Sequence, residues 1–496
     1  MSFILNYCRS SIVSLGLLVF ASVLGAGPVH ELTLEASITI GLETSPAARI
    51  AQEQFNQNVW NNRAYRAELG PQLSLSGTVP QVTRSLEEIQ LDSLSWGFRE
   101  QNRIESRMTV SYAQDILPTG GELWAYSSLQ RLEQTGRVDY INWLASPLVL
   151  GYTQPLFQFN NKKWGRETER IRLNYYRRLH AENMQALAGD IVRYFFDLVI
   201  AQMQVDIAAF NLAVNDTIYT ISKGRYEVGK IAENDLLRTE LAMMNAQNSM
   251  ERYKLEYDRT YLELQRHLGL SHEDSFTVVV PEGIPDLSLT PEEALALARK
   301  GRSDYLSWEI QERDADRRVH DTRSRYGFSA NLSTSIGYDQ TGGKFKDLYE
   351  EPLSRETVTL SFDVPLTRQK SQAELQAAYS NMEATHWQIE QNRRRFEEDV
   401  HYQVRELHLL KQQLLNAAKS DTIAAMQFEV AKNRYLIGKT NITSLFTAQS
   451  EKDSARRQYH QTLKNYWIAY FNLRRLTLYD FARHQSLLEE TQFPDD

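Results

Sequence analysis

The sequence predicts a mixed fold in which β-strands suited to a membrane are joined to unusually long helices, with the whole unit present twice. Three observations predict this class: two long runs without proline, several segments in which apolar and polar residues alternate, and phrases that recur at constant offsets. With 496 residues, the chain is long enough for two or three ordinary domains, but the recurrence favours one duplicated unit.

Composition indicates an ordered protein and excludes one class of partner. Charged residues make up 24% of the chain and hydrophobic residues 42%, which is typical of folded rather than disordered proteins. The net charge is −8, and acidic and basic residues are interspersed. Because nucleic-acid binding needs a concentrated basic surface, we expect no nucleic-acid partner.

Residues 1–27 have the pattern of a signal peptide. Arg9 precedes an apolar run from Ile12 to Leu24, and small residues follow it. About thirteen apolar residues are too few for a transmembrane helix, which needs roughly twenty. The only cysteine, Cys8, lies within this segment, so we expect a mature chain without cysteine. An exported chain of this kind is periplasmic, secreted, or inserted in an outer membrane.

Two internal repeats account for most of the chain. We place the first at residues 28–280 and the second at 281–480, followed by a polar C-terminal tail at 481–496. The phrase around Leu32 returns around Leu289, an offset of 257, and the same offset still holds more than forty residues later. A shared offset over this length indicates duplication.

Each repeat is expected to begin with a helix. In the first repeat this helix covers 32–69 and is broken near Pro46, because the residue before a proline avoids the helical conformation. In the second repeat the helix begins near Pro291, and proline is favourable in the first turn of a helix.

Strands are expected within 71–157 and 328–365. Apolar residues alternate there with small polar ones, so each strand has one apolar and one polar face. This pattern suits a membrane barrel with a wet lumen, and equally a soluble sandwich with one solvated face. The signal peptide and the long helices favour the barrel. The apolar positions are Leu73, Leu75, Val79, Met108, Val110, Tyr112, Leu148, Leu150, Tyr152, Ala330, Leu332, Ile336, Tyr338, Val358, Leu360, Phe362 and Val364.

Matching strand-to-helix corners end the strands of the two repeats, at Pro155 and Pro365. Their offset of 210 is 47 smaller than the offset of the repeat starts, so the first repeat carries an insert within 80–147. A turn at 117–121, rich in proline and glycine, separates two strand-like pieces of this insert. The insert either adds a β-hairpin or forms an ornamented loop, and the sequence leaves both open.

The two proline-free runs predict long helical hairpins at 162–270 and 369–479. Their tips are expected near 226–236 and 435–447, where glycine can end a helix in the left-handed conformation. A hairpin this long has too little core of its own, so it must pack sideways against copies of itself. A heptad seam supports this, with Leu187, Ile191, Tyr194, Leu198, Ala201, Val205, Ala208 and Leu212 in the first run, and Phe396, Val400, Leu407, Leu410, Leu414 and Ala417 in the second, interrupted by Gln403.

Motifs for catalysis and for cofactors are weak in this sequence. The segment from Gly224 to Lys230 resembles a nucleotide-binding Walker A loop but is followed by Ile231, where that motif needs a hydroxyl. The ten histidines are scattered, and no histidine or cysteine pair has metal-ligand spacing with an acidic third residue. We therefore expect no enzyme activity, no cofactor and no metal site.

The order of helix, strands and long hairpin, used twice, resembles the TolC family of outer membrane efflux proteins over essentially all of the mature chain. The resemblance implies a mixed fold, with a membrane β-barrel and a long α-helical barrel that a homotrimer completes from two repeats per protomer. It also implies an outer membrane channel-tunnel of a Gram-negative bacterium that extends into the periplasm. Such a channel is the exit duct of a tripartite efflux pump or a type I secretion system. Its partners would be outer membrane lipid, a periplasmic adaptor (membrane fusion) protein, and an inner-membrane RND or ABC transporter.

The resemblance assigns a gate to the hairpin tips. Asp235 matches the acidic partner in the hydrogen-bonded lock that closes the family's tunnel, and Tyr435 matches the tyrosine that reaches it from the facing hairpin. The arginine that assists in the family corresponds to Thr440 here. That part of the lock is therefore missing or is supplied by the neighbouring Lys439.

The constriction is expected to differ from that of the best-known family member. The two aspartates that ring the constriction of that member correspond to Ser444 and Thr447 here. Glu233 and Asp235 are therefore the acids left near the tip. Because hydroxyls do not concentrate cations as a ring of carboxylates does, we expect a less cation-selective closed pore. The residues expected to form the tip turns are Tyr226, Gly229 and Gly438.

One alternative from another class remains at this stage. A periplasmic coiled-coil adaptor or structural protein, not inserted in a membrane, would also have a signal peptide and long helical hairpins. It predicts a product that is soluble after osmotic shock, whereas the channel needs detergent.

Overall fold

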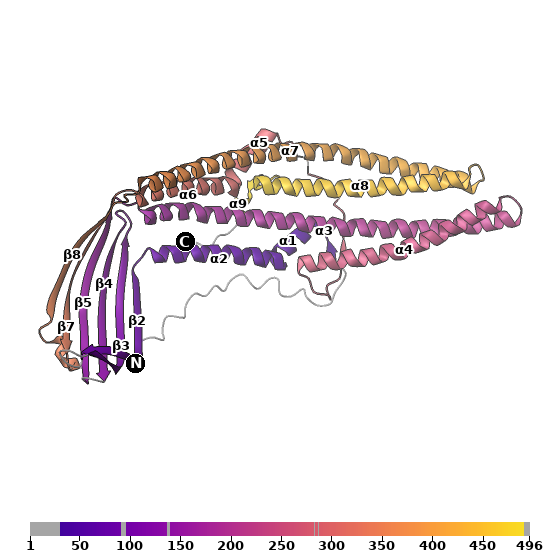
Figure 1. The fold of residues 1–496 in the computed structure, drawn as a ribbon. Coiled ribbons are helices and arrows are strands. Elements are labelled where there is room, and N and C mark those ends of the chain that lie inside the picture. The colour runs from indigo at the N-terminus through magenta and orange to yellow at the C-terminus, as the bar shows by residue number, and fades with distance from the viewer. Residues whose placement is uncertain (1–29, 91–95, 136–138, 282, 286, 491–496) are drawn as a thin grey trace. The chain divides into compact units, whose positions relative to one another are not determined.

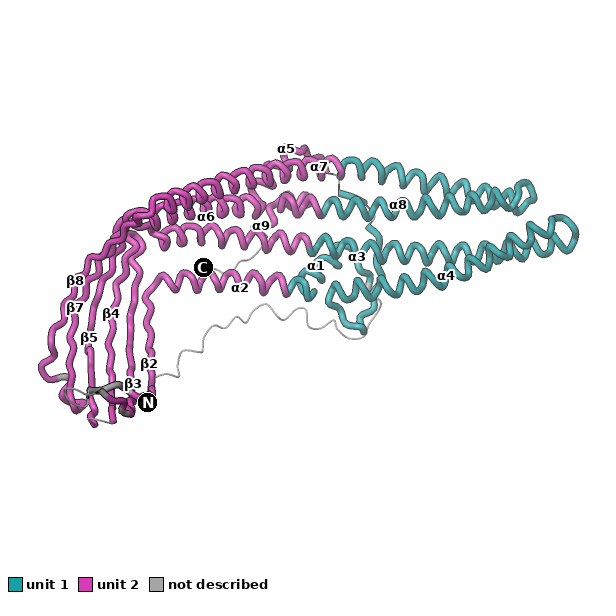
Figure 2. The backbone as a smooth tube through the Cα atoms, viewed as in Figure 1, with its two compact units in different colours: residues 1–49, 187–286, 407–471 teal, residues 50–186, 287–406, 472–496 magenta. Residues whose placement is uncertain are grey.

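The computed structural model describes residues 30–90, 96–135, 139–281, 283–285 and 287–490 (Figure 1). The chain forms two compact units (Figure 2). The first unit comprises 1–49, 187–286 and 407–471, and the second comprises 50–186, 287–406 and 472–496. The signal peptide expected at 1–27 lies outside the described residues.

A six-stranded antiparallel sheet forms the β-structure at one end of the second unit, in the order β2-β3-β4-β5-β7-β8 (Figure 1). β3 and β4 pair with each other, and also with β2 and β5 respectively, so the insert expected at 80–147 adds a β-hairpin to the sheet. β2 and β8 are its two edges. The strands are β2 (Gln72–Gln90), β3 (Trp96–Ile116), β4 (Gly121–Thr135), β5 (Tyr140–Leu156), β7 (Ser329–Gly342) and β8 (Leu353–Asp363), and a short 3₁₀ helix, η1 (Phe345–Tyr349), lies between the last two.

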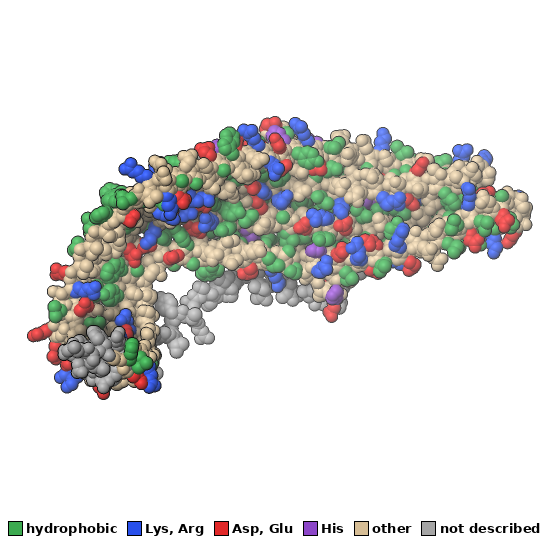
Figure 3. All heavy atoms as spheres, viewed as in Figure 1, with side chains coloured by type: hydrophobic (Ala, Val, Ile, Leu, Met, Phe, Trp, Pro, Cys, Tyr) green, Lys and Arg blue, Asp and Glu red, His purple; other side chains and the backbone are tan. Residues whose placement is uncertain are grey.

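The pairing register separates an apolar face of the sheet from a polar one, as the alternation in the sequence predicts. Apolar side chains remain exposed in the single chain, for example Val358 at 76% and Leu360 at 62%, and Figure 3 shows hydrophobic side chains at the surface over the strands. An apolar face of this extent requires a covering phase or partner. Opposed pairs are Leu75–Val110, Leu150–Ile336 and Leu332–Leu360 on the apolar face, and Ser74–Ser111, Ser76–Thr109 and Ser333–Thr359 on the polar face.

Each repeat starts with two helices separated by a one-residue break. In the first repeat the break is Ser45, whose ψ of 145° is extended, as expected before Pro46. In the second repeat it is Arg302, with a ψ of 142°. A capping box starts the second pair, because Thr290 Oγ1 accepts a hydrogen bond from the Glu293 N–H and the Glu293 carboxylate accepts one from the Thr290 N–H. The helices are α1 (Leu34–Thr44), α2 (Pro46–Glu68), α5 (Pro291–Gly301) and α6 (Ser303–Arg325).

One long hairpin follows the strands of each repeat. The first consists of α3 (Asn161–Glu227) and α4 (Glu233–Leu268), and the second of α7 (Arg368–Leu436) and α8 (Ile442–Thr477). The long helices have 67 and 69 residues, and both shorter helices have 36. The two hairpins are therefore nearly equal in length.

The core of the first unit lies along the helical seam. Phe195, Phe196 and Leu264 are fully buried there. In the second unit, Gln403, which interrupts the predicted heptads of α7, is followed by the buried Val404. By length and composition alone, α3 has one 18-residue stretch apolar enough to cross a membrane, with a mean hydropathy of 1.3, a test that core helices also pass. Of the predicted seam, Leu187, Ile191, Leu198, Ala201, Ala208, Phe396, Val400, Leu407, Leu414 and Ala417 are buried.

Short ribbons complete the two units. In the first unit, β1 (His30–Leu32) pairs in parallel with β6 (Phe276–Val278). In the second unit, β9 (Tyr479–Asp480) pairs with β10 (Gln485–Ser486), and the helical turn α9 (Leu487–Glu490) follows. The start of the C-terminal segment, which composition suggests to be a polar tail, is therefore folded. Phe481 and Leu487 are the buried side chains that hold it, at 7% and 5% exposed.

Candidate functional site

Both hairpins turn through the same hydrogen-bonded motif. In the first tip, Gly229 has a φ of 70°, its N–H donates to the Tyr226 carbonyl at 2.8 Å, and the next N–H donates to the Arg225 carbonyl at 2.8 Å. In the second tip, Gly438 has a φ of 74° and makes the corresponding bond to the Tyr435 carbonyl at 2.9 Å. Since only glycine adopts this conformation without strain, the two glycines set where each long helix ends.

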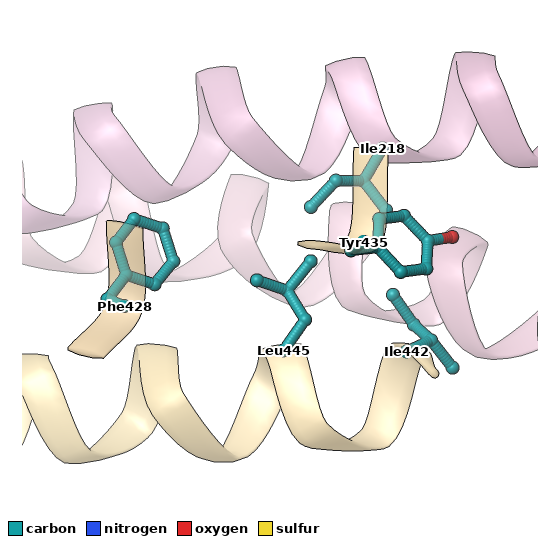
Figure 4. Packing of buried hydrophobic residues seen from close by; sticks show 5 residues of the cluster. All are labelled: Ile218, Phe428, Tyr435, Ile442 and Leu445. Carbon is teal, nitrogen blue, oxygen red and sulfur yellow. The ribbon is translucent and has the colours of Figure 1, made fainter. Parts of the chain in front are cut away.

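A buried contact joins the two hairpins next to these turns. The hydroxyls of Tyr435 on α7 and Ser222 on α3 lie 2.9 Å apart, and both residues are buried. A small apolar cluster surrounds the tyrosine, and Figure 4 shows its side chains converging between the helices. The cluster consists of Ile218, Phe428, Tyr435, Ile442 and Leu445, with Val214, Ala431 and Phe446 packed against it.

Arg225 reinforces the same contact from α3. Its guanidinium donates to the Leu436 carbonyl at 2.8 Å and to the Tyr435 carbonyl at 3.3 Å, and it lies 5.3 Å from the centre of the Tyr435 ring. The last carbonyls of a helix have no partner within it and carry partial negative charge. Arg225 therefore caps α7 with a charge-assisted bond.

The structure does not bring the expected acidic partner to Tyr435. Asp235 and Glu233 lie in the first turn of α4, where negative charge is favourable near the helix N-terminus. Glu233 is exposed and Asp235 half-buried, and among the described residues neither side chain has a hydrogen-bond or ion-pair partner. In this chain, the hydroxyl of Tyr435 is paired with Ser222 instead.

The other tip positions lie at the start of α8. Lys439 is exposed and Thr440 is half-buried, both in the turn between α7 and α8. Ser444 and Thr447 are exposed and lie one turn apart on α8. The Ser444 N–H donates to the Asn441 side chain at 2.9 Å, which caps the helix.

Three further predicted positions can be placed. Pro155 lies within β5, opposite Asn331 of β7, and the backbone turns at Phe157, which has a φ of 60°. Pro365 lies in the short link between β8 and α7. Tyr226, the counterpart of Tyr435, is 40% exposed, whereas Tyr435 is 6% exposed.

The polar face of the sheet carries paired charges. Arg107 donates to Glu105 at 3.1 Å and to Gln130 at 2.9 Å, and Gln130 in turn donates to Glu105 at 2.9 Å. These three polar residues lie on adjacent strands, on the face opposite the exposed apolar side chains. Such a face suits contact with water.

A half-buried lysine of α8, Lys452, contacts α3 farther from the tip. Lys452 Nζ lies 3.9 Å from the ring centre of Phe210 and 4.6 Å from that of Phe428, and 3.4 Å from Asp453 Oδ1. Asn211 donates to the other oxygen of Asp453 at 2.5 Å. Burial lowers the pKa of Lys452, while the adjacent Asp453 carboxylate opposes this effect. The aromatic rings and the carboxylate together accommodate the cation.

Sequence reasoning missed Ser222 and the role of Arg225. The recurrence of Arg-Tyr at Arg225-Tyr226 and Arg434-Tyr435 was the available signal, because it marks both helix ends. No metal-binding group of three or more His, Cys, Asp or Glu side chains occurs among the described residues.

Comparisons with known proteins are consistent with this architecture. The fold is similar to the outer membrane channel CmeC of Campylobacter jejuni, with 13% identity, a TM-score of 0.65, and 90% of this chain and 85% of that chain covered. It is also similar to the outer-membrane channel OprN, with 15% identity, a TM-score of 0.63, and 90% and 89% covered. For the MtrE channel of Neisseria gonorrhoeae in its open state, the values are 14%, 0.58, 90% and 88%.

The sequence comparisons give the family. No curated protein sequence matches this chain. The family model described as outer membrane efflux protein matches residues 42–270 and 294–477, which is most of the chain. The chain therefore belongs to the outer membrane efflux protein family, as the resemblance to TolC proteins predicted, and it is an outer membrane channel protein that extends into the periplasm.

Proposed function

We propose that this protein is a homotrimeric exit duct for export across the outer membrane, gated at the periplasmic tips of its helical hairpins. The open sheet carries this proposal. Among the described strands, its two edges, β2 and β8, are unpaired, and one face is apolar and exposed. Unpaired backbone groups cannot face lipid, so a sheet of this kind enters a membrane only as part of a closed barrel.

Three copies would supply six strands each, eighteen in all. Because the strand number in one chain is even, β8 of one copy can pair with β2 of the next in antiparallel fashion around the whole ring. Membrane barrels of sixteen to eighteen strands enclose an aqueous channel. The polar face with Glu105, Arg107 and Gln130 would line this channel.

The gate would lie at the tips. Individual hydrogen bonds there contribute about 1 kcal/mol each, so a threefold set holds the tip closed yet is within reach of a docking partner's binding energy. Tyr435 is held by Ser222 in this chain, and Asp235 is available as a second acceptor when neighbouring copies approach. Lys439 and Thr440 lie in the adjoining turn and would take the position of the family's assisting arginine.

Ion selectivity at the closed tip would follow from the side-chain hydroxyls of α8. Ser444 and Thr447 are exposed on α8, and the acids that remain are Glu233 and Asp235. We expect weak cation selectivity and weak block by divalent cations. A strong divalent block from the periplasmic side in a planar-bilayer recording would contradict this part of the proposal.

Partners follow from the position of the gate. A passive duct needs an energy source, which an inner-membrane RND or ABC transporter would supply through a periplasmic adaptor. The family model is described as outer membrane efflux protein, which supports export of small compounds, and type I protein secretion is the second use we propose.

The test is cell fractionation followed by current recording in a planar bilayer. The full chain should fractionate with outer membranes, require detergent, migrate as a trimer, and form pores in a planar bilayer. A monomer released by osmotic shock, with no pore activity, would instead support the periplasmic adaptor or structural protein.

A further inference from the structure

The two repeats allow a contact between copies to be inferred from a contact within one copy. The tip turns are superimposable in sequence at an offset of 209, which relates Tyr226 to Tyr435 and Gly229 to Gly438. They also share the same hydrogen bonds and the same positive φ. Residues of one tip can therefore be matched one by one to residues of the other.

Within one chain, the contact uses the end of α3 from the first repeat against α7 and α8 from the second. Arg225 donates to the carbonyl of Leu436, the last residue of α7. At the matching positions stand Arg434 and Glu227, the last residue of α3. The Arg434 side chain is exposed, and within the described part of the chain it has no hydrogen-bond or ion-pair partner.

We propose that Arg434 of one copy caps the α3 helix of the next copy at the Tyr226 and Glu227 carbonyls, so that every second seam around the tunnel tip is a contact between copies. This inference rests on the proposed trimer and identifies the residues that close it. A second copy of this chain thus covers the exposed α3–α4 tip surface, with its α7 helix facing that surface.

The exposure of matched residues supports this assignment. Tyr435 is 6% exposed in the contact within the chain, and its counterpart Tyr226 is 40% exposed. Ile423, the counterpart of the packed Val214, and Leu237, the counterpart of the packed Phe446, are both 54% exposed. Apolar side chains in the same arrangement are therefore covered in one case and uncovered in the other, which is the pattern of an interface lacking its partner.

The seam between copies differs chemically from the seam within a chain. Ile218 and Ile442 of the buried cluster correspond to Gln427 and Glu233, and Leu436 corresponds to Glu227. The contact between copies is therefore less apolar, and it adds acidic side chains near Arg434. Apolar burial stabilises the seam within a chain more strongly than the seam between copies. Opening should therefore separate neighbouring copies before it separates the two hairpins of one copy.

Cross-linking tests the contact directly. The two cysteines of a pair are introduced into the mature chain, which has no other cysteine after Cys8. Arg434→Cys with Glu227→Cys forms the test pair, and Arg225→Cys with Leu436→Cys forms the matched control. None of these four side chains is fully buried, so the variants should fold. The detergent-extracted protein is treated with a short bis-maleimide and separated on a denaturing gel.

The expected result is a ladder of covalent dimers and trimers for the test pair, and a monomer with an internal cross-link for the control. A protein that is trimeric by size but whose test pair remains monomeric overturns this inference and leaves the proposed duct standing. A protein that is monomeric in detergent overturns the proposed duct, and the inference with it.

Discussion

The hydroxyl of Ser222 on α3 lies 2.9 Å from that of Tyr435 on α7, in a buried contact between the two hairpins of one chain. One of the two hydroxyls donates and the other accepts, so removal of either leaves a buried polar group without its partner. Such a group costs about 1 to 3 kcal/mol. At this contact, one hydroxyl oxygen can be removed from either side chain without other changes to the tip.

We expect Ser222→Ala and Tyr435→Phe each to loosen the closed tip and to raise single-channel conductance in planar bilayers. The double variant should resemble the single ones, because both substitutions remove the same bond. Asp235→Ala is the comparison, since Asp235 has no hydrogen bond to Tyr435 in this chain. If Asp235→Ala raises conductance and Ser222→Ala does not, the acidic partner holds the tyrosine in the closed trimer.

The tip glycines give a second prediction. Gly229→Ala and Gly438→Ala should each destabilise the protein by about 1 to 2 kcal/mol, because an L side chain is strained at these positive φ values. No atom lies within 4 Å of a Cβ built at either position, so the cost arises from the backbone alone. Gly224→Ala is the control. It lies inside α3 with equally open surroundings, and there alanine should stabilise the helix by roughly 0.5 to 1 kcal/mol. Equal effects at all three positions, measured by chemical denaturation, would contradict this explanation.

The two faces of the sheet should respond oppositely to charge. Leu360→Arg places a cation on the apolar face, opposite Leu332, and we expect a loss of folded protein from the outer membrane fraction. An arginine facing lipid costs about 2 to 4 kcal/mol at the bilayer midplane. The neighbouring Ser361→Arg lies on the polar face, opposite Asn331, and should be tolerated. Intact membrane insertion of both variants would show that the apolar face does not contact lipid.

Buried histidines predict a loss of stability in mild acid. Burial lowers the pKa of His460 and of His180, and Arg456 lowers that of His460 further. In the unfolded chain a histidine titrates near 6.5, so below this pH the unfolded state binds more protons than the folded state. Stability should therefore fall as the pH decreases from about 6.5 toward the lower folded-state values.

The measurement is thermal unfolding at pH 7.5 and 5.5. The double variant His460→Gln with His180→Gln should reduce the pH dependence, although it can lower the stability at pH 7.5. An unchanged pH dependence in the double variant would mean that other groups cause the acid sensitivity.

Sequence patterns predicted the helices and the strand faces better than the contacts. The break at Ser45, the hairpins and the alternating faces all depend on local signals such as proline, glycine and periodicity. The extent of the inserted hairpin was harder to predict. Beyond Pro80, charged residues such as Arg84, which pairs with Glu100 across β2 and β3, obscure the period of two.

The partner of Tyr435 could not be predicted from the sequence. Ser222 is 213 residues away along the chain, and a lone serine on a long helix has no distinguishing pattern. Which face of α3 meets α7 depends on how whole helices pack, and family likeness indicated Asp235 instead. Tertiary packing therefore decides a hydrogen bond that local signals cannot specify.

The near-equal hairpins, with long helices of 67 and 69 residues and short ones of 36, limit how this gene can change length. One extra turn in a single hairpin would shift its tip by about 5.4 Å along the axis, so the six tips of the proposed trimer would no longer be level. A strand pair added to the sheet would only enlarge the circumference of the proposed barrel, equally in every protomer. Natural variation in channel diameter should thus arise through added β-hairpins, whereas helical insertions should persist only when both helical hairpins acquire them together.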